Sequence, residues 1–387
     1  MTTVTSHDVG HTTESTFSRV SVWLMLIFMS IATASDGYNA AVIGNISLLF
    51  DVLYPGALTS TMYSRLSNAF LIGMILGMVA FGYIADQFGR KTGAVMTTII
   101  LTVGVIISAA ASGKTETGML WMLVVGRGIA GVGAGGEYPV TGAGAMEATD
   151  ESSGFRKRRG FVFAIMSEVA ASLGYCFGAL VPLILLLANA SESMIKTLGW
   201  GVIINSFYLP GPFLGGWLAD KIGRRQTMTL GFVLQAVLGF ILGGAYDKIQ
   251  SIFPLFVVMY GIFLTLGEVG PGSTIALISA EPFPTSIRGQ CNGLISAFAK
   301  VGATAGTEVF AAILTNYKHR EEKGNQTVFM IGSAFALLGA VLAWFLLEDV
   351  SLNLDDEDEE WKCYLAAHGW EGTWGDNETQ DPRRAVQ

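Results

Sequence analysis

Residues 82–91 have the sequence Gly82-Tyr-Ile-Ala-Asp86-Gln-Phe-Gly89-Arg90-Lys91, and residues 216–225 repeat its pattern as Gly216-Trp-Leu-Ala-Asp220-Lys-Ile-Gly223-Arg224-Arg225. Glycine, alanine, aspartate, glycine and arginine stand at the same offsets in both copies. Each copy ends an apolar segment and closes with a second basic residue. A charged turn that occurs twice in an apolar chain indicates an internal duplication, and many secondary transporters are built from such repeats.

The composition predicts an integral membrane protein. Of the 387 residues, 51% are hydrophobic and only 14% are charged, and the mean hydropathy is +0.50, which argues against a water-soluble domain of this length. The net charge of −8 comes from the C-terminal end, because residues 348–387 contain 12 acidic and three basic side chains. The acidic balance therefore describes a tail, and we expect no nucleic-acid partner.

Apolar segments of about 20 residues, the length that crosses a bilayer, recur along the chain. We expect ten of them to form transmembrane helices, so the fold class is an all-α polytopic membrane protein. Basic residues concentrate in cytoplasmic loops, which places both repeated turns and both termini in the cytoplasm, with the protein in the plasma membrane. The expected spans cover residues 20–46, 65–86, 92–112, 118–145, 160–188, 198–219, 228–247, 252–278, 290–315 and 327–347.

The predicted organisation has two transmembrane halves between polar ends. A cytoplasmic segment, 1–19, precedes an N-terminal half of five helices, 20–188. A short outside linker, 189–197, leads to a C-terminal half of five helices, 198–347. The acidic cytoplasmic tail, 348–387, is low in apolar residues and is expected to be disordered.

Few residues of this chain suggest covalent modification or enzyme chemistry. Asn189 and Asn325 begin Asn-X-Ser/Thr sequences on the predicted outer side, where N-glycosylation can occur. The three cysteines have neither a disulfide pattern nor metal-ligand spacing. No nucleotide-binding loop or nucleophile–base set stands out, so we expect neither an enzyme nor a cofactor or metal.

The repeated turn, G-x-x-x-D-x-x-G-R-[K/R], resembles the signature of the major facilitator superfamily. Residues 126–139, Gly-Arg-Gly-Ile-Ala-Gly-Val-Gly-Ala-Gly-Gly-Glu-Tyr-Pro, are similar to the fourth helix of its proton-coupled phosphate permeases. The segments Ser35-Asp36-Gly-Tyr-Asn39 and Ser279-Ala-Glu281 resemble fungal-type glycerophosphoinositol and glycerophosphodiester permeases. The resemblance covers residues 20–347 and implies a two-half helical bundle that carries a small-molecule substrate through the lipid bilayer.

The span count departs from this resemblance. Family members have twelve helices, with six between the two signatures, whereas only four of the expected spans fit between Lys91 and Asp220. The sixth helix, the central loop and the seventh helix are predicted to be missing. Because two spans are lost together, both signatures still face the same side.

Two charged residues lie inside apolar segments, where a charge needs a partner or a function. Asp36 follows a run of apolar residues in the first span, and Lys300 lies mid-span between Ala299 and Val301. Asp36 is predicted to serve function, with a neutral interhelical hydrogen bond as the alternative. Lys300 is predicted to bind an anion, with an ion pair to Glu268 or Glu308 as the alternative.

The resemblance assigns further roles within the transport path. It implies that Asp36 and Glu137 couple protons, and that Tyr138, Lys300 and Glu268 bind the substrate. This chain has Gly272 where phosphate permeases have asparagine, and Ser167 with Glu168 where they have glutamine. The missing amide favours a bulkier phosphodiester over inorganic phosphate.

The two signatures are predicted to form a gate that opens and closes as the halves rock. Glu281 and Arg288 match a family gate pair, and the run Arg156–Arg159 is interpreted as a topology anchor. The complete predicted gate comprises Asp86, Arg90, Lys91, Asp220, Arg224, Arg225, Glu281 and Arg288.

The leading hypothesis is therefore proton-coupled uptake of a phosphorylated organic anion, such as a glycerophosphodiester. Inorganic phosphate and sugar-type substrates are alternatives within the same class. A truncated membrane protein that regulates rather than transports is the alternative outside it, since polar groups left facing lipid are costly.

Overall fold

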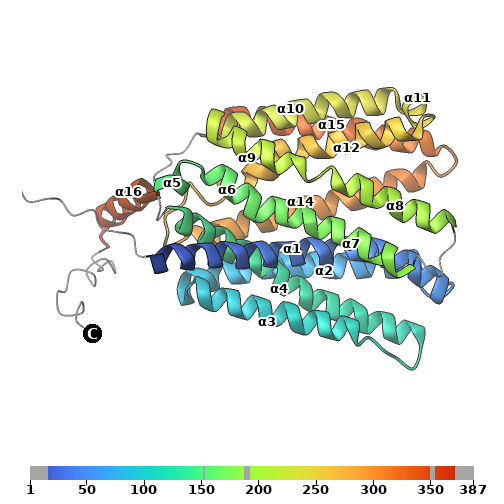
Figure 1. Ribbon diagram of the computed structural model, residues 1–387, viewed down its shortest axis with the longest axis horizontal. Helices are drawn as coiled ribbons and strands as arrows, with labels where there is room; N and C mark the ends of the chain where they lie inside the picture. The colour runs from blue at the N-terminus through green and yellow to red at the C-terminus, as the bar shows by residue number, and fades with distance from the viewer. Residues whose placement is uncertain (1–15, 151–152, 187–191, 349–353, 371–387) are drawn as a thin grey trace, which may run out of the picture.

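The computed structural model describes residues 16–150, 153–186, 192–348 and 354–370. Within these ranges the chain is helical and contains no strand. The helices run side by side along one axis, as Figure 1 shows. In chain order they are α1 (Thr16–Leu53), α2 (Ser60–Phe88), α3 (Arg90–Ala109), α4 (Glu116–Asp150), α5 (Ser153–Arg156), α6 (Arg159–Ala164), η1 (Ile165–Val169), α7 (Ala170–Leu186), α8 (Glu192–Ser206), α9 (Pro210–Ile222), α10 (Arg224–Gly244), α11 (Tyr246–Gln250), α12 (Phe253–Gly267), η2 (Glu268–Gly272), α13 (Ser273–Ile278), α14 (Arg288–Asn316), α15 (Glu321–Leu346) and α16 (Leu354–Ala367).

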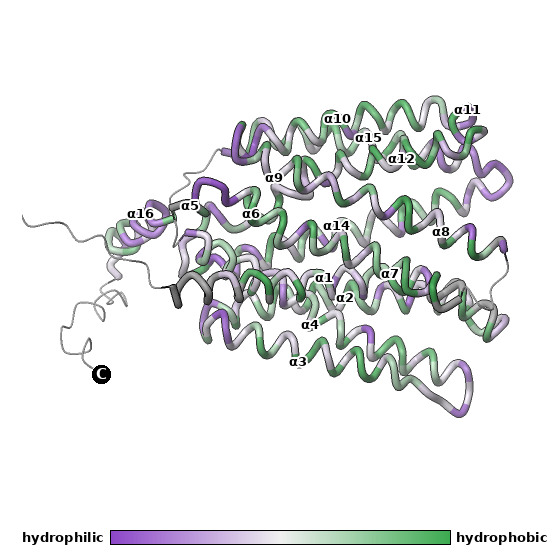
Figure 2. The backbone as a smooth tube through the Cα atoms, viewed as in Figure 1, coloured by the Kyte–Doolittle hydropathy of each residue, from purple (hydrophilic) through white to green (hydrophobic). Residues whose placement is uncertain are grey.

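All ten expected spans coincide with helices. In the described part of the chain, eight helices are long and apolar enough to cross a membrane. The other two expected spans correspond to α1 and to the bent pair α8–α9, whose bend precedes Pro210. Figure 2 shows hydrophobic residues along the helices and hydrophilic residues gathered at their ends, as a bilayer requires. The prediction of an all-α membrane protein with fewer than twelve membrane helices is confirmed.

Small residues allow the helices of the first half to approach closely. Helix α4 packs along both α2 and α3. A Cβ atom at Gly77 of α2 would overlap the carbonyl oxygen of Val132 in α4, and one at Gly135 would overlap the carbonyl oxygen of Met74. The glycine run of α4 therefore serves helix packing, as small residues do in membrane bundles.

Helix α14 connects the two halves but has few neighbours along its second part. It packs on α2 and α4 of the first half, and a Cβ at Gly293 would overlap the carbonyl oxygen of Met78. None of its residues from 298 to 316 is buried. The end of α14 away from the signatures thus lacks the helix neighbours that its first turns possess.

The expectation of a disordered tail is wrong for residues 354–367, which form α16. Leu354 is 3% exposed and packs in an apolar cluster with residues of both halves, including Leu26, Met146 and Leu277. This contact stabilises a helix in a segment whose acidic composition alone would leave it unfolded. Helix α16 lies at the same end of the bundle as the start of α1 (Figure 1).

Candidate functional site

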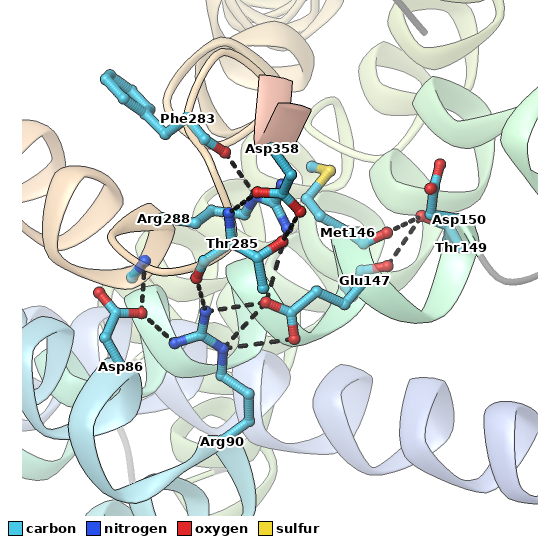
Figure 3. Close-up of polar contacts among 12 residues, drawn as sticks. Asp86, Arg90, Met146, Glu147, Thr149, Asp150, Phe283, Thr285, Arg288 and Asp358 are labelled. Atoms are coloured by element: carbon cyan, nitrogen blue, oxygen red, sulfur yellow. Dashed lines mark hydrogen bonds and ion pairs between the residues drawn. The ribbon is translucent and has the colours of Figure 1, made fainter. Parts of the chain in front are cut away.

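The first signature joins the two halves of the protein. Asp86, near the end of α2, accepts hydrogen bonds from the backbone N–H groups of Gly289 (3.0 Å) and Gln290 (2.7 Å) in the first turn of α14. Arg90 binds Asp86 and also Glu147 of α4, with Nη2 2.8 Å from Oε1 (Figure 3). An anion at a helix N-terminus is favoured by the helix dipole, so Asp86 holds α14 against α2.

The second signature repeats this arrangement with the halves exchanged. Asp220 of α9 accepts hydrogen bonds from the N–H groups of Gly160 and Phe161, both at 2.8 Å, at the start of α6. Arg224 donates two hydrogen bonds of 2.9 Å to the carboxylate of Glu281. A bidentate arginine–carboxylate contact of this kind is stronger than a hydrogen bond between neutral groups.

We name these groups the α14 cluster (Asp86, Arg90, Glu147, Arg288) and the α6 cluster (Asp220, Arg224, Glu281, Arg159). In each cluster, the signature arginine and the glutamate that it binds are 57 residues apart in sequence. Arg288 lies 3.6 Å from Glu147, and Arg159 lies 3.5 Å from Glu281. Both of these arginines are fully buried, so separating the halves at this end would leave buried charges unpaired, which is costly.

The structure corrects two predictions about these residues. Glu281 and Arg288 do not pair with each other, because each belongs to a different cluster. Arg159, expected to be part of an anchor, is a buried member of the α6 cluster and also binds Asp150. Over the described residues, no ion pair includes the predicted gate members Lys91 and Arg225, and the guanidinium of Arg225 instead lies 4.8 Å from the ring centre of Trp344.

Helix α16 is attached to the α14 cluster through one threonine. The N–H and hydroxyl of Thr285 donate to the two carboxylate oxygens of Asp358 at 2.6 and 2.8 Å. The carbonyl of Thr285 accepts a hydrogen bond of 3.2 Å from Arg90 (Figure 3). Partial burial raises the pKa of the neighbouring Glu357, and the charge of Glu360 raises it further.

Removing this attachment should release the tail helix. In Asp358→Ala, we expect amide hydrogen exchange over residues 354–367 to accelerate by about 30-fold, because the lost carboxylate accepts two hydrogen bonds worth about 1 kcal/mol each. Glu359→Ala removes the same charge from an exposed position of α16 and serves as the control. Equal exchange rates in the two variants would show that Asp358 does not hold the helix.

A cavity of about 230 Å³ lies between the halves, with walls from α1, α2, α4, α6, η1, α7, η2, α13 and α14. Four of its described wall residues carry charged groups, and two are tyrosines: Asp36, Glu168, Glu268, Lys300, Tyr138 and Tyr175. Both halves therefore contribute charged groups to one cavity.

Lys300 faces this cavity without a close ionic partner. Its Nζ lies 5.3 Å from the ring centre of Tyr138, within the range of a cation–π interaction. Among the described residues no ion pair within 4.0 Å joins Lys300 to Glu268 or Glu308, and Glu308 accepts a hydrogen bond from Asn68. The structure thus shows neither of these ion pairs, and anion binding by Lys300 stays a prediction.

The two acids expected to couple protons lie at different depths. Asp36 is 4% exposed, lines the cavity, and has an Oδ1 atom without a hydrogen-bond partner. Glu137 is also 4% exposed, but it lies behind the wall and not on it. Both acids are therefore buried, and only Asp36 lines the cavity.

Two further acids of the wall occupy unusual backbone geometry. Glu168 lies in the π-helical turn η1 and Glu268 begins the π-helical turn η2. Such turns occur frequently at functional sites. A Cβ at Gly272 would overlap the Oε2 atom of Glu268, so a residue larger than glycine at 272 would displace this carboxylate.

The expected glycosylation sites receive no support. Asn189 lies outside the described residues. Asn325 belongs to the first turns of α15, and its amide nitrogen, which would carry the glycan, donates to the hydroxyl of Tyr246 at 2.9 Å.

Comparison with known proteins identifies the family. Residues 25–211 match the family described as "Sugar (and other) transporter", and residues 169–375, more than half of the chain, match the family described as "Major Facilitator Superfamily". The chain belongs to the Major Facilitator Superfamily. This confirms the resemblance carried by the repeated signature and places the chain among transporters, not enzymes.

Its relatives within the superfamily include a protein named as a permease. The MFS-type transporter lnaF of Aspergillus flavus is 30% identical over 90% of this chain and 87% of its own length. Glycerophosphoinositol permease 1 of Candida albicans is 29% identical over 91% of this chain and 83% of its own length. A solved double tryptophan mutant of XylE, 16% identical, superposes with a TM-score of 0.71 over 88% of this chain and 99% of its own, which shows a shared fold.

This member of the Major Facilitator Superfamily is shorter than its relatives. The alignment with lnaF extends over 443 positions but includes only 90% of the 387 residues here. About 95 of those positions therefore hold residues of the relative alone. A bundle with fewer than twelve helices agrees with this difference and with the unpacked end of α14.

Proposed function

We propose that this chain is a secondary transporter that takes up a glycerophosphodiester together with protons. The observation that carries the proposal is Lys300, a partly buried cation on the cavity wall beside Tyr138 with no close carboxylate partner in the described chain. A phosphodiester supplies the single negative charge that this ammonium lacks. The relative from Candida albicans, named a glycerophosphoinositol permease, supports the same substrate class.

In this proposal, Lys300 and the hydroxyl of Tyr138 hold the phosphate, and Glu268 contacts the rest of the substrate. Asp36 binds a proton from the cavity and exchanges it with Glu137. A charged carboxylate in this apolar setting is costly. Protonation of Asp36, together with substrate binding, would therefore leave the loaded site with a net charge small enough for the site to move across the membrane.

The two ion-pair clusters would gate the cytoplasmic side. They hold α14 to α2 and α6 to α9 in the state described by the structure. Movement of the halves, 20–188 and 198–347, about the linker 189–197 would break both clusters together and expose the cavity. We place this end in the cytoplasm of the plasma membrane, with both termini, because of its basic residues.

A second candidate function follows from α14. Since none of its residues from 298 to 316 is buried, one side of the transport path lacks a helix wall. A membrane protein that binds the substrate but regulates other processes, without transport, would tolerate such an opening.

Uptake by transporter-deficient cells separates these functions. Cells that display the chain at their surface should accumulate labelled glycerophosphoinositol faster than cells with an empty vector, and lowering the external pH should increase the rate. Faster uptake of only inorganic phosphate or only a sugar would replace the substrate assignment. No uptake of any of the three, despite surface expression, would favour the regulatory protein.

A further inference from the structure

Helix α14 has little cover from other helices at the level of the cavity. Phe298, Ala299, Val301 and Gly302 are exposed, and Lys300 between them is partly exposed. Because an α-helix completes a turn every 3.6 residues, this exposure extends around one whole turn of α14. In the described chain the main neighbours of α14 are α2, α4 and α15. The turn that carries Lys300 is therefore uncovered on its other sides.

One face of this open helix leads out of the cavity. Ile295 and Ala299 line the cavity wall. Gly302, Gly306 and Val309 follow on the same face, because residues three and four positions apart in a helix lie on one side. A Cβ atom at Gly302 or Gly306 would have no atom within 4 Å, and Val309 is 53% exposed. The apolar face that lines the cavity thus continues, uncovered, beyond it.

This face is placed to contact lipid in a membrane. Helix α14 is one of the helices long and apolar enough to cross a bilayer. At a rise of 1.5 Å per residue, Lys300 and Val309 are about 14 Å apart along the helix axis. A lipid tail beside this stretch would remain in hydrocarbon while the headgroup attached to it enters the cavity. A wall closed by a further helix would exclude such a molecule.

The cavity supplies the polar contacts of a headgroup that carries both a phosphate and hydroxyl groups. The ammonium of Lys300 attracts a phosphodiester. The Oδ1 of Asp36 and the Oε2 of Glu268 are buried without hydrogen-bond partners in the described chain, Asp36 is only 4% exposed, and both residues line the cavity. The hydroxyl groups of a polyol can donate to these oxygens, and pairing a buried acceptor is favourable because an unpaired one costs free energy.

We propose that this chain also accepts a lysophospholipid with a polyol phosphodiester headgroup. The headgroup enters the cavity at Lys300, and the single acyl chain lies along the open face of α14, defined by Ile295, Ala299, Gly302, Gly306 and Val309. The inference rests on the proposed function, because a glycerophosphodiester and its acylated form share the same phosphate contact.

Competition binding to the full-length chain in lipid nanodiscs tests the lipid substrate. The probe is labelled glycerophosphoinositol, and the competitors are unlabelled glycerophosphoinositol, octanoyl lysophosphatidylinositol and monooctanoylglycerol, which has the chain without the phosphodiester. We expect the lysophospholipid to displace the probe at about tenfold lower concentration than glycerophosphoinositol does, since methylene groups are removed from water. Monooctanoylglycerol should not displace the probe.

Tryptophan substitutions on the open face separate the acyl chain from the headgroup. Gly302→Trp and Gly306→Trp should each raise the required concentration of lysophospholipid about tenfold and leave the affinity for glycerophosphoinositol unchanged, because the ring occupies the place of the acyl chain. Gly306 lies one turn farther from the cavity, so its variant keeps the test valid if Gly302→Trp also obstructs the headgroup. Partition of the lysophospholipid into the disc is the same for every variant.

Gly332→Trp is the matched control. A Cβ atom at Gly332, in α15, likewise has no atom within 4 Å, but α15 contributes no residue to the cavity wall. This variant should change neither affinity.

The outcomes distinguish the lipid substrate from the proposed function. Failure of the lysophospholipid to displace the probe, displacement by monooctanoylglycerol at the same concentration, or equal effects of Gly306→Trp and Gly332→Trp would overturn the lysophospholipid proposal while uptake of a glycerophosphodiester stands. Absence of probe binding by unmodified protein that unfolds cooperatively would overturn the proposed function as well.

Discussion

Lys300→Ala abolishes saturable uptake of the phosphodiester and weakens its binding by at least about 30-fold, since removing one partner of a buried charge pair costs about 2 kcal/mol or more. The physical reason is the wall position of Lys300: its ammonium faces the cavity beside Tyr138 and has no close carboxylate partner there. The measurement is binding of labelled glycerophosphoinositol to purified protein, together with uptake by cells.

The controls for this variant separate charge from packing. Lys300→Met keeps the length of the side chain without its charge and should fail as the alanine variant does. Lys196→Ala removes an exposed ammonium that pairs with Glu192 outside the cavity, and uptake should be unchanged. Unaltered affinity in Lys300→Ala would remove the substrate assignment.

We expect Glu281→Gln to open the end of the bundle at which the two signatures lie. The carboxylate of Glu281 accepts both hydrogen bonds from Arg224 and lies 3.5 Å from the fully buried Arg159. Breaking a buried pair by removing one partner costs about 3–5 kcal/mol. We expect the closed state to lose most of that stabilisation and uptake to fall steeply, since the gate can no longer close.

Cys291 reports this opening. It lies in the first turns of α14, next to the Asp86 contact, and is only partly exposed. In a Cys176→Ser, Cys363→Ser background, Glu281→Gln should accelerate maleimide labelling of Cys291 by about tenfold or more. Glu116→Gln is the matched control and should label at the unmodified rate. Labelling of the Glu281 variant at that same rate would show that the α6 cluster does not hold the gate.

The transmembrane helices could be predicted from sequence because their length is set by the bilayer. Each expected span coincides with a helix, including the bent pair α8–α9. The π-helical turns at Glu168 and Glu268 could not be predicted in this way, since hydropathy does not distinguish them from regular helix.

The partners of the signature residues were missed because they lie far away along the chain. Glu147 and Arg159 were not among the predicted gate residues, although Glu147 follows Arg90 at the same separation of 57 residues that divides Arg224 from Glu281. The repeated spacing of 57 residues was the sequence signal that could have identified Glu147 as a gate residue. Glu281 and Arg288 were assigned as a gate pair from the family resemblance, and tertiary packing placed them in separate clusters.

The acidic tail shows where composition fails. Residues 348–387 have few apolar side chains, yet Leu354 inserts among residues of both halves and Asp358 binds Thr285. The burial of Leu354 and the hydrogen bonds of Asp358 depend on the assembled bundle, so no local sequence pattern predicts them. The cavity could not be predicted from local sequence either, because its wall combines residues from both halves of the chain.

Transport by the purified chain in proteoliposomes tests the central claim most directly. With an inward proton gradient, labelled glycerophosphodiester should accumulate above its external concentration, and a protonophore should abolish the accumulation. Filling no faster than in protein-free liposomes, by protein that still binds the diester, would contradict the account and show that this shortened member of the superfamily binds its ligand without carrying it.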